Sequence, residues 1–138
     1  EAKQKEKKRD SIIDGVPTAL PGLHRSRRIQ EKAASVGFDW ETKAQVIAKV
    51  DEEILELKES ISENKNIEEE FGDVLFSIVN LSRHLNIDPE RALKYAIDKF
   101  SNRFKKIESD LNKKKIKIKN LSFQELDDLW EKNKKKYK

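Results

Sequence analysis

The fold is decided by residues 46–85, which read VIAKVDEEILELKESISENKNIEEEFGDVLFSIVNLSRHL. Apolar side chains recur at every third or fourth position in both halves of this stretch, which is the spacing of one face of an α-helix. We expect one helix over about 41–61 and another over about 67–85, with the polar run 62–66 as the turn between them. Helices joined by so short a turn pack as antiparallel neighbours. The stretch therefore predicts a helical hairpin.

Three further helices are expected around this hairpin. One covers about 24–36 and ends at Gly37, because glycine is the residue that most often follows a helix. Another begins at Pro89, since proline is favoured at the first helical position. The last opens at a capping box formed by Ser122 and Glu125. We therefore predict an all-α fold, a bundle of four to five helices.

The composition supports this class and excludes several others. Only 36% of the 138 residues are hydrophobic and 41% are charged, so the core is thin and we expect a partner subunit to complete it by dimerisation. Four glycines and three prolines are too few for the turns of an all-β sandwich. Without cysteine the chain has no disulfide, thiolate metal site or cysteine nucleophile.

The location and extent of the domain are also predicted from sequence. No apolar run reaches the roughly 18–20 residues of a membrane span, and the polar N-terminus has no secretory h-region, so we expect a soluble cytoplasmic protein. Residues 1–15 are expected to be a polar leader and residues 16–138 a single domain. The first residue is Glu rather than Met, which suggests a fragment of something longer.

Acidic side chains gather on the helical hairpin. On its first helix Glu53 and Glu56 lie about 60° apart beside the apolar face, and Glu70 and Asp73 do the same on the second helix. Antiparallel packing can turn both pairs into one cleft. Four carboxylates raise one another's pKa unless a cation neutralises them. Mg²⁺ is the expected cofactor, because it takes oxygen ligands and commonly shares its shell with substrate phosphates.

A solvated acidic helix face is the alternative, because a chain with 26 acidic residues produces such patterns by composition alone. A carboxylate-bridged di-iron site is excluded. It requires Glu-x-x-His pairs, and His84 is preceded at that spacing by Leu81.

Basic side chains lie on the helix that begins at Pro89. Lys99 and Arg103 are one turn apart and are suited to bind the phosphates of a metal-bound ligand. Trp130 and Lys134 near the C-terminus could stack on a base and reach a phosphate. The other interpretation is a basic helix face beside core phenylalanines, with the tryptophan closing that core.

Charge is strongly segregated along the chain. The net charge is +4, yet residues 51–73 hold ten acids against two lysines. The lysine-rich run 113–119 is expected to be a solvated connector, partly extended at Ile116 and Ile118, and it receives no role. A non-catalytic nucleic-acid-binding module and a helical oligomerisation domain are the competing functions. Nucleic acid is disfavoured, because aromatic residues are not interleaved with the basic runs.

Together these residues resemble the MazG family of nucleoside triphosphate pyrophosphohydrolases. The resemblance covers about residues 15–134. This part of the chain resembles the C-terminal catalytic half of full-length members. The strings that carry it are GVP at 15–17, ALP at 19–21, QEKAASVGFDW at 30–40, KVDEEILEL at 49–57, EEFGDVLF at 69–76, VNLSRHL at 79–85 and KFSNRF at 99–104.

The resemblance implies Mg²⁺-dependent hydrolysis of ribo- or deoxyribonucleoside triphosphates to the monophosphate and pyrophosphate, by a helical homodimer. It implies four metal ligands, which are Glu53, Glu56, Glu70 and Asp73. Glu52 is implied as a group that supports the ligands or orients the attacking water. Contacts to phosphate or sugar are implied for Lys49, Asn80, Lys99 and Arg103, and closure over the nucleotide for Trp130 and Lys134. Base and sugar preference and the number of metal ions stay open.

Overall fold

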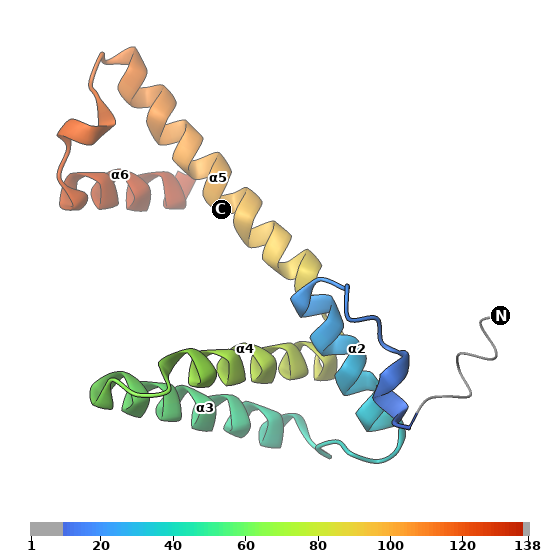
Figure 1. The fold of residues 1–138 in the computed structure, drawn as a ribbon. Helices are drawn as coiled ribbons and strands as arrows, with labels where there is room; N and C mark the ends of the chain where they lie inside the picture. The colour runs from blue at the N-terminus through green and yellow to red at the C-terminus, as the bar shows by residue number, and fades with distance from the viewer. Residues whose placement is uncertain (1–9, 137–138) are drawn as a thin grey trace. The chain divides into compact units, whose positions relative to one another are not determined.

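The computed structural model describes residues 10–136, with side chains as far as residue 134. Within that range the chain is helical and has no β-strand, so the predicted all-α class is confirmed (Figure 1). It divides into two compact units, residues 1–90 and 91–138. The elements in order are η1 (Ile12–Gly15), α2 (Gly22–Ser35), α3 (Lys43–Glu63), α4 (Ile67–His84), α5 (Pro89–Lys113), η2 (Ile118–Asn120) and α6 (Phe123–Lys136).

The first unit is built on the predicted hairpin of α3 and α4, which lie side by side (Figure 1). The turn between them uses Asn64 and Asn66, both in the left-handed conformation that asparagine tolerates better than most residues. Helix α2 packs against α4, and the short η1 turn packs against α2. Val46 of α3 and Val79 of α4 are the most completely buried side chains of the hairpin. They form the centre of its small core.

Helix α3 begins two residues later than predicted, and its first turn explains why. The Thr42 hydroxyl accepts a hydrogen bond from the Gln45 backbone N–H at 3.2 Å, while Gln45 Oε1 accepts from the Thr42 N–H at 3.0 Å. This reciprocal pair is a capping box and fixes the start of the helix at Lys43. The Thr-x-x-Gln signal is present in the sequence, directly before Val46, the first residue of the apolar stripe.

The predicted inward faces of the helices are mostly not buried in this chain. Phe71, Leu75 and Ile78 of α4 are about half exposed, and so are Ile97 and Phe100 of α5. Packing within one chain therefore leaves these apolar faces largely uncovered. Periodicity identifies which face of a helix is apolar, but it does not show what covers that face.

The second unit consists of α5 from Arg91 onward, η2 and α6. Ile107 and Leu111 are its buried apolar residues. The Phe100 ring lies 5.0 Å from the Trp130 ring, centroid to centroid, which joins α5 to α6. The predicted capping box at the start of α6 is confirmed, because the Glu125 N–H donates to the Ser122 hydroxyl and the Glu125 carboxylate accepts from the Ser122 N–H.

Two expected irregular segments are more ordered than predicted. In the leader, the Ser11 and Asp14 side chains cap the η1 turn, and Val16 directly after it is buried. Residues 1–9 lie outside the described residues. In the lysine-rich connector, Ile118 begins the 3₁₀ turn η2 rather than an extended segment. None of the described helices is long and apolar enough to span a membrane.

Candidate functional site

Three acidic side chains of the hairpin converge on one point. Glu53 of α3 and Glu70 and Asp73 of α4 each offer a carboxylate oxygen, and these oxygens all lie within 4.8 Å of one another. Glu70 and Asp73 are one helical turn apart, so they point the same way from α4. Antiparallel packing brings Glu53 opposite them. Three of the four predicted metal ligands therefore form one group, named here the acidic cluster.

Two oxygens of the acidic cluster lack the partners that buried carboxylates require. Glu53 is only 6% exposed, and its Oε2 atom has no hydrogen-bond partner among the described residues. Glu70 Oε2 is buried in the same unsatisfied way. A buried carboxylate oxygen that lacks a hydrogen-bond partner is destabilising. The donor set consists of carboxylate oxygens, which suits a hard divalent cation. The acidic cluster therefore fits a metal ion.

The electrostatics of the acidic cluster agree with this interpretation. Burial raises the pKa of the Glu70 carboxyl above its usual value, and the nearby charges of Glu56, Asp73, Glu53 and Glu69 raise that pKa further. Glu56, the fourth predicted ligand, is half-buried and lies outside the group of three. Because the Glu56 charge raises the pKa of Glu70, Glu56 nevertheless lies near the acidic cluster. All four predicted ligands thus contribute to one concentrated negative potential.

Lys49 forms an ion pair with the other carboxylate oxygen of Glu53, Oε1. Its Nζ lies 2.9 Å from Glu53 Oε1 and donates a hydrogen bond to Glu52 Oε2, also at 2.9 Å. These two bonds raise the pKa of the Lys49 ammonium above its usual value. Glu53 therefore uses one oxygen on Lys49 and leaves the other free for the acidic cluster. Glu52 is exposed and can meet solvent or ligand.

A cavity of about 740 Å³ adjoins the acidic cluster within the first unit. Its size lies in the range typical of small-molecule sites. The cavity is lined by Glu53, Asp73 and Lys49 and by the rings of Phe38 and Trp40, which belong to the α2–α3 loop. The predicted contact residue Asn80 lines it as well.

Gln30 of α2 is a polar lining residue that the sequence prediction did not single out. Its Nε2 donates to the Phe76 carbonyl oxygen at 2.9 Å. Because that oxygen can only accept, the orientation of the amide is fixed and Oε1 is left as an acceptor. This Oε1 is buried and has no partner among the residues described.

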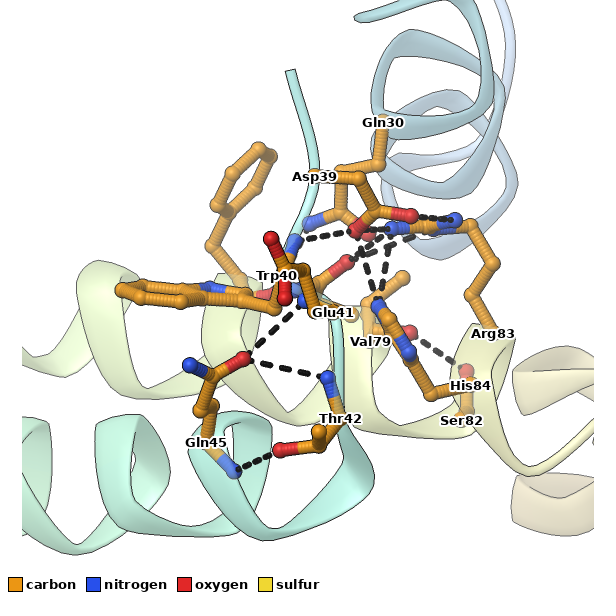
Figure 2. Close-up of polar contacts among 12 residues, drawn as sticks. Gln30, Asp39, Trp40, Glu41, Thr42, Gln45, Val79, Ser82, Arg83 and His84 are labelled. Atoms are coloured by element: carbon orange, nitrogen blue, oxygen red, sulfur yellow. Dashed lines mark hydrogen bonds and ion pairs between the residues drawn. The ribbon is translucent and has the colours of Figure 1, made fainter. Parts of the chain in front are cut away.

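The loop between α2 and α3 is tied to the end of α4 by Asp39. Figure 2 shows the Asp39 carboxylate between the Arg83 guanidinium and the His84 ring. Arg83 donates from Nη1 at 3.1 Å and from Nη2 at 2.6 Å, and His84 Nε2 lies 2.9 Å away. The hydrogen bonds from Arg83 and His84 hold the pKa of the Asp39 carboxyl at about 2. Asp39 and His84 are part of the sequence strings that carry the family resemblance, but their spacing in the sequence does not predict that they contact each other.

The remaining predicted residues lie in the second unit. Lys99 and Lys134 are exposed, whereas Arg103 is only 8% exposed. The Arg103 guanidinium carbon lies 5.6 Å from the centre of the Trp130 ring, which is a cation–π distance. Arg103 and Trp130 therefore contact each other, and the phosphate and base contacts expected of the basic residues stay predictions.

Comparison with known proteins identifies the hairpin. Residues 41–107 match the family model described as the MazG nucleotide pyrophosphohydrolase domain. This chain contains a MazG domain. The match begins one residue before the α3 capping box and ends in α5, so it includes the whole acidic cluster.

Curated proteins that resemble the chain include some named as nucleoside triphosphate pyrophosphohydrolases. It is 49% identical over 133 residues to the Thermotoga maritima protein named nucleoside triphosphate pyrophosphohydrolase/pyrophosphatase MazG, covering 96% of this chain and 52% of that protein. It is 36% identical over 130 residues to the Escherichia coli K12 nucleoside triphosphate pyrophosphohydrolase, covering 91% and 49%. It is also 38% identical to the uncharacterised Bacillus subtilis protein YabN, covering 92% and 27%. The chain spans about half the length of the first two relatives.

Proposed function

We propose that this chain is a Mg²⁺-dependent nucleoside triphosphate pyrophosphohydrolase, which cleaves a ribo- or deoxyribonucleoside triphosphate to the monophosphate and pyrophosphate. The observation that carries the proposal is the acidic cluster, which has two buried oxygens without a hydrogen-bond partner among the described residues and adjoins a cavity of about 740 Å³. The MazG domain and the names of the relatives support the same activity.

The acidic cluster is the proposed Mg²⁺ site. Glu53, Glu70 and Asp73 would hold the ion, and Glu56 adds its charge to the same potential. Mg²⁺ suits three carboxylates that leave part of its shell for water and phosphate oxygens. When bound, the ion would neutralise charge on the triphosphate and lower the pKa of the attacking water.

Lys49 and Glu52 are proposed to act beside that site. Lys49 fixes the rotamer of Glu53 through its 2.9 Å contact and can donate to a phosphate oxygen from the cavity wall. Glu52 is exposed and would orient the attacking water and accept its proton. The water oxygen forms a bond to phosphorus as the bond to pyrophosphate breaks, in line with it. Glu52 thus receives the proton that this substitution releases.

The cavity is the proposed site of the nucleoside. Phe38 and Trp40 offer ring faces on which a planar base can stack, and Asn80 offers an amide to the sugar or phosphate. Lys99 and Arg103 are proposed to bind the phosphates. Trp130 and Lys134, by the family resemblance, would close over the nucleotide.

We further propose that the chain works as a homodimer. Large apolar side chains remain about half exposed on both α4 and α5, including Phe71, Leu75 and Ile97. Contiguous apolar faces of this kind mark interaction sites in stable proteins. A second copy of the chain would cover them and complete the thin core. Sedimentation of the purified chain at twice the monomer mass is the expected observation.

A panel of nucleotides assayed with Mg²⁺ tests the activity. We expect pyrophosphate, and no orthophosphate, from at least one nucleoside triphosphate. Glu53→Ala should abolish this release while leaving helicity by circular dichroism intact, because it removes the most buried ligand. Glu59→Ala is the matched control, since Glu59 lies on the same helix and is exposed. Salt-dependent binding of nucleic acid without any triphosphate turnover would overturn the proposal in favour of a nucleic-acid-binding module.

A further inference from the structure

The α2–α3 loop presents two aromatic side chains that packing covers only in part. Phe38 is 82% exposed and Trp40 is 45% exposed, yet both line the cavity beside the acidic cluster. Buried apolar contacts normally fix the position of such rings. Here Phe38 is mostly uncovered and Trp40 is nearly half uncovered. The position of this part of the cavity wall must therefore depend on the backbone that carries the rings.

Asp39, which lies between the two rings in sequence, anchors that backbone. Its Oδ1 accepts from the Trp40 N–H at 2.8 Å, and its carboxylate binds both nitrogens at the end of the Arg83 guanidinium. Paired hydrogen bonds between an arginine and a carboxylate are stronger and more directional than single ones. One carboxylate thus joins the loop to α4.

The α4 side of this contact is itself fixed. Arg83 also donates to Asn80 Oδ1, from Nη2 at 2.8 Å and from Nε at 3.3 Å, so its guanidinium has little freedom to move. The His84 ring approaches the same Asp39 oxygen at 2.9 Å. Because a carboxylate only accepts, this contact is a hydrogen bond in the tautomer or charge state whose Nε2 carries a proton. Arg83 and His84 side chains are largely buried.

We propose that Asp39 is a positioning residue that holds Phe38 and Trp40 as the wall of the cavity and so sets the affinity of the site for the base of a nucleotide. The inference rests on the proposed function for the identity of the ligand. Asp39 acts through the two rings and through Arg83, and it takes no part in the chemistry at phosphorus. The depressed pKa of Asp39 agrees with this role, because the carboxylate is ionised at neutral pH.

The Asp39→Asn variant tests the proposal, because it keeps the size of the side chain and removes its charge. We expect the KM for the best nucleoside triphosphate to rise on the order of tenfold with kcat within about twofold of the wild type. The affinity for a slowly hydrolysed nucleotide analogue should fall by the same factor. Inorganic tripolyphosphate, which has no base, should compete as well as it does with the wild type, and Mg²⁺ binding should be unchanged.

Two further variants complete the experiment. Arg83→Lys keeps a cation near Asp39 but loses the paired hydrogen bonds, so its KM should lie between those of the wild type and Asp39→Asn. Asp110→Asn is the matched control, since Asp110 is also paired with a cation, Lys106, at 3.0 Å, and lies in the second unit. Its KM should equal that of the wild type.

The outcomes separate the two proposals. Unchanged nucleotide affinity in Asp39→Asn would overturn the positioning role. Equal losses for the nucleotide analogue, tripolyphosphate and Mg²⁺ would also overturn it, because they would show that Asp39 supports the whole unit. A wild-type chain that binds the analogue but releases no pyrophosphate would defeat the proposed hydrolysis, while the loss of analogue affinity in Asp39→Asn would still support the positioning of the rings.

Discussion

The two units of this chain differ in whether their buried charged side chains have partners. In the first unit Glu53 and Glu70 are held with buried oxygens that have no partner among the described residues. In the second unit Arg103 is equally buried, but it lies against the ring of Trp130. A folded protein normally satisfies its buried polar groups. The unsatisfied oxygens of the first unit therefore favour a cation-binding site, whereas the second unit has no such buried, unpartnered oxygen among its described side chains.

The largest effect is expected from a substitution in the acidic cluster of the first unit. Asp73→Asn removes one negative charge from the acidic cluster while keeping the shape of the side chain. We expect pyrophosphate release to fall by roughly a hundredfold or more, because charge stabilisation by a bound metal contributes several kcal/mol to such reactions. The thermal shift on adding Mg²⁺ should disappear as well. A steady-state assay with increasing Mg²⁺ measures the first effect, and thermal denaturation with and without Mg²⁺ measures the second.

Asp51→Asn provides the control for Asp73→Asn. Asp51 is an exposed acid on α3 and is not a member of the acidic cluster. Its removal changes the net charge of the chain by the same amount. Near-normal turnover in Asp73→Asn would exclude Asp73 as a metal ligand. An equal loss in Asp51→Asn would show that general negative charge, and not the cluster, binds the metal.

A smaller effect is expected from the second unit. Lys99→Ala should weaken the binding of a slowly hydrolysed nucleotide about tenfold, the usual contribution of a charged hydrogen bond to phosphate, and leave Mg²⁺ binding unchanged. Titration calorimetry with Mg²⁺ alone, and then with Mg²⁺ and the nucleotide, separates the two. Lys94→Ala is the control, because Lys94 lies on the same helix and pairs with Asp98 at 2.8 Å. Loss of Mg²⁺ binding in Lys99→Ala would contradict the proposal that the first unit binds the metal and Lys99 binds only the nucleotide.

The helices could be predicted from sequence because their signals are local. Apolar periodicity and the caps at Ser122 and Pro89 placed them within about two residues of their observed bounds. Burial could not be predicted in the same way. Phe71 and Leu75 form a regular apolar face, but whether that face is covered depends on packing between elements and on partners. A periodic pattern contains no information on either.

The acidic cluster was predictable for a similar reason, and the Asp39 contact was not. An i, i+3 pair on each arm of a short hairpin has few ways to point, so three of the four carboxylates converge as expected. Asp39 and Arg83 are 44 residues apart and meet only because the α2–α3 loop returns over the end of α4. Gln30 likewise acquires its role from the Phe76 backbone carbonyl. Contacts set by tertiary packing have no local spacing to reveal them.

The smallest expected effect concerns the stability of the metal-free chain, and its sign follows from the pKa of Glu70. That pKa is raised in the folded state, so between the unfolded value of about 4.5 and the folded value the folded protein binds more protons than the unfolded one. Stability is therefore lost as pH rises through this window, and ionised Glu70 destabilises the chain at pH 7.

Glu70→Gln should accordingly raise the urea midpoint at pH 7 without Mg²⁺, and the difference from the wild type should shrink as the pH falls below about 4.5, where Glu70 becomes protonated in both states. Adding Mg²⁺ should reverse the order, because only the wild type retains the full set of carboxylates for the ion. A Glu70→Gln chain that is less stable than the wild type without metal would show that other contacts already compensate the charge of Glu70. The unpartnered carboxylate oxygens of the first unit would then not destabilise the metal-free chain, and the difference drawn between the two units would be wrong.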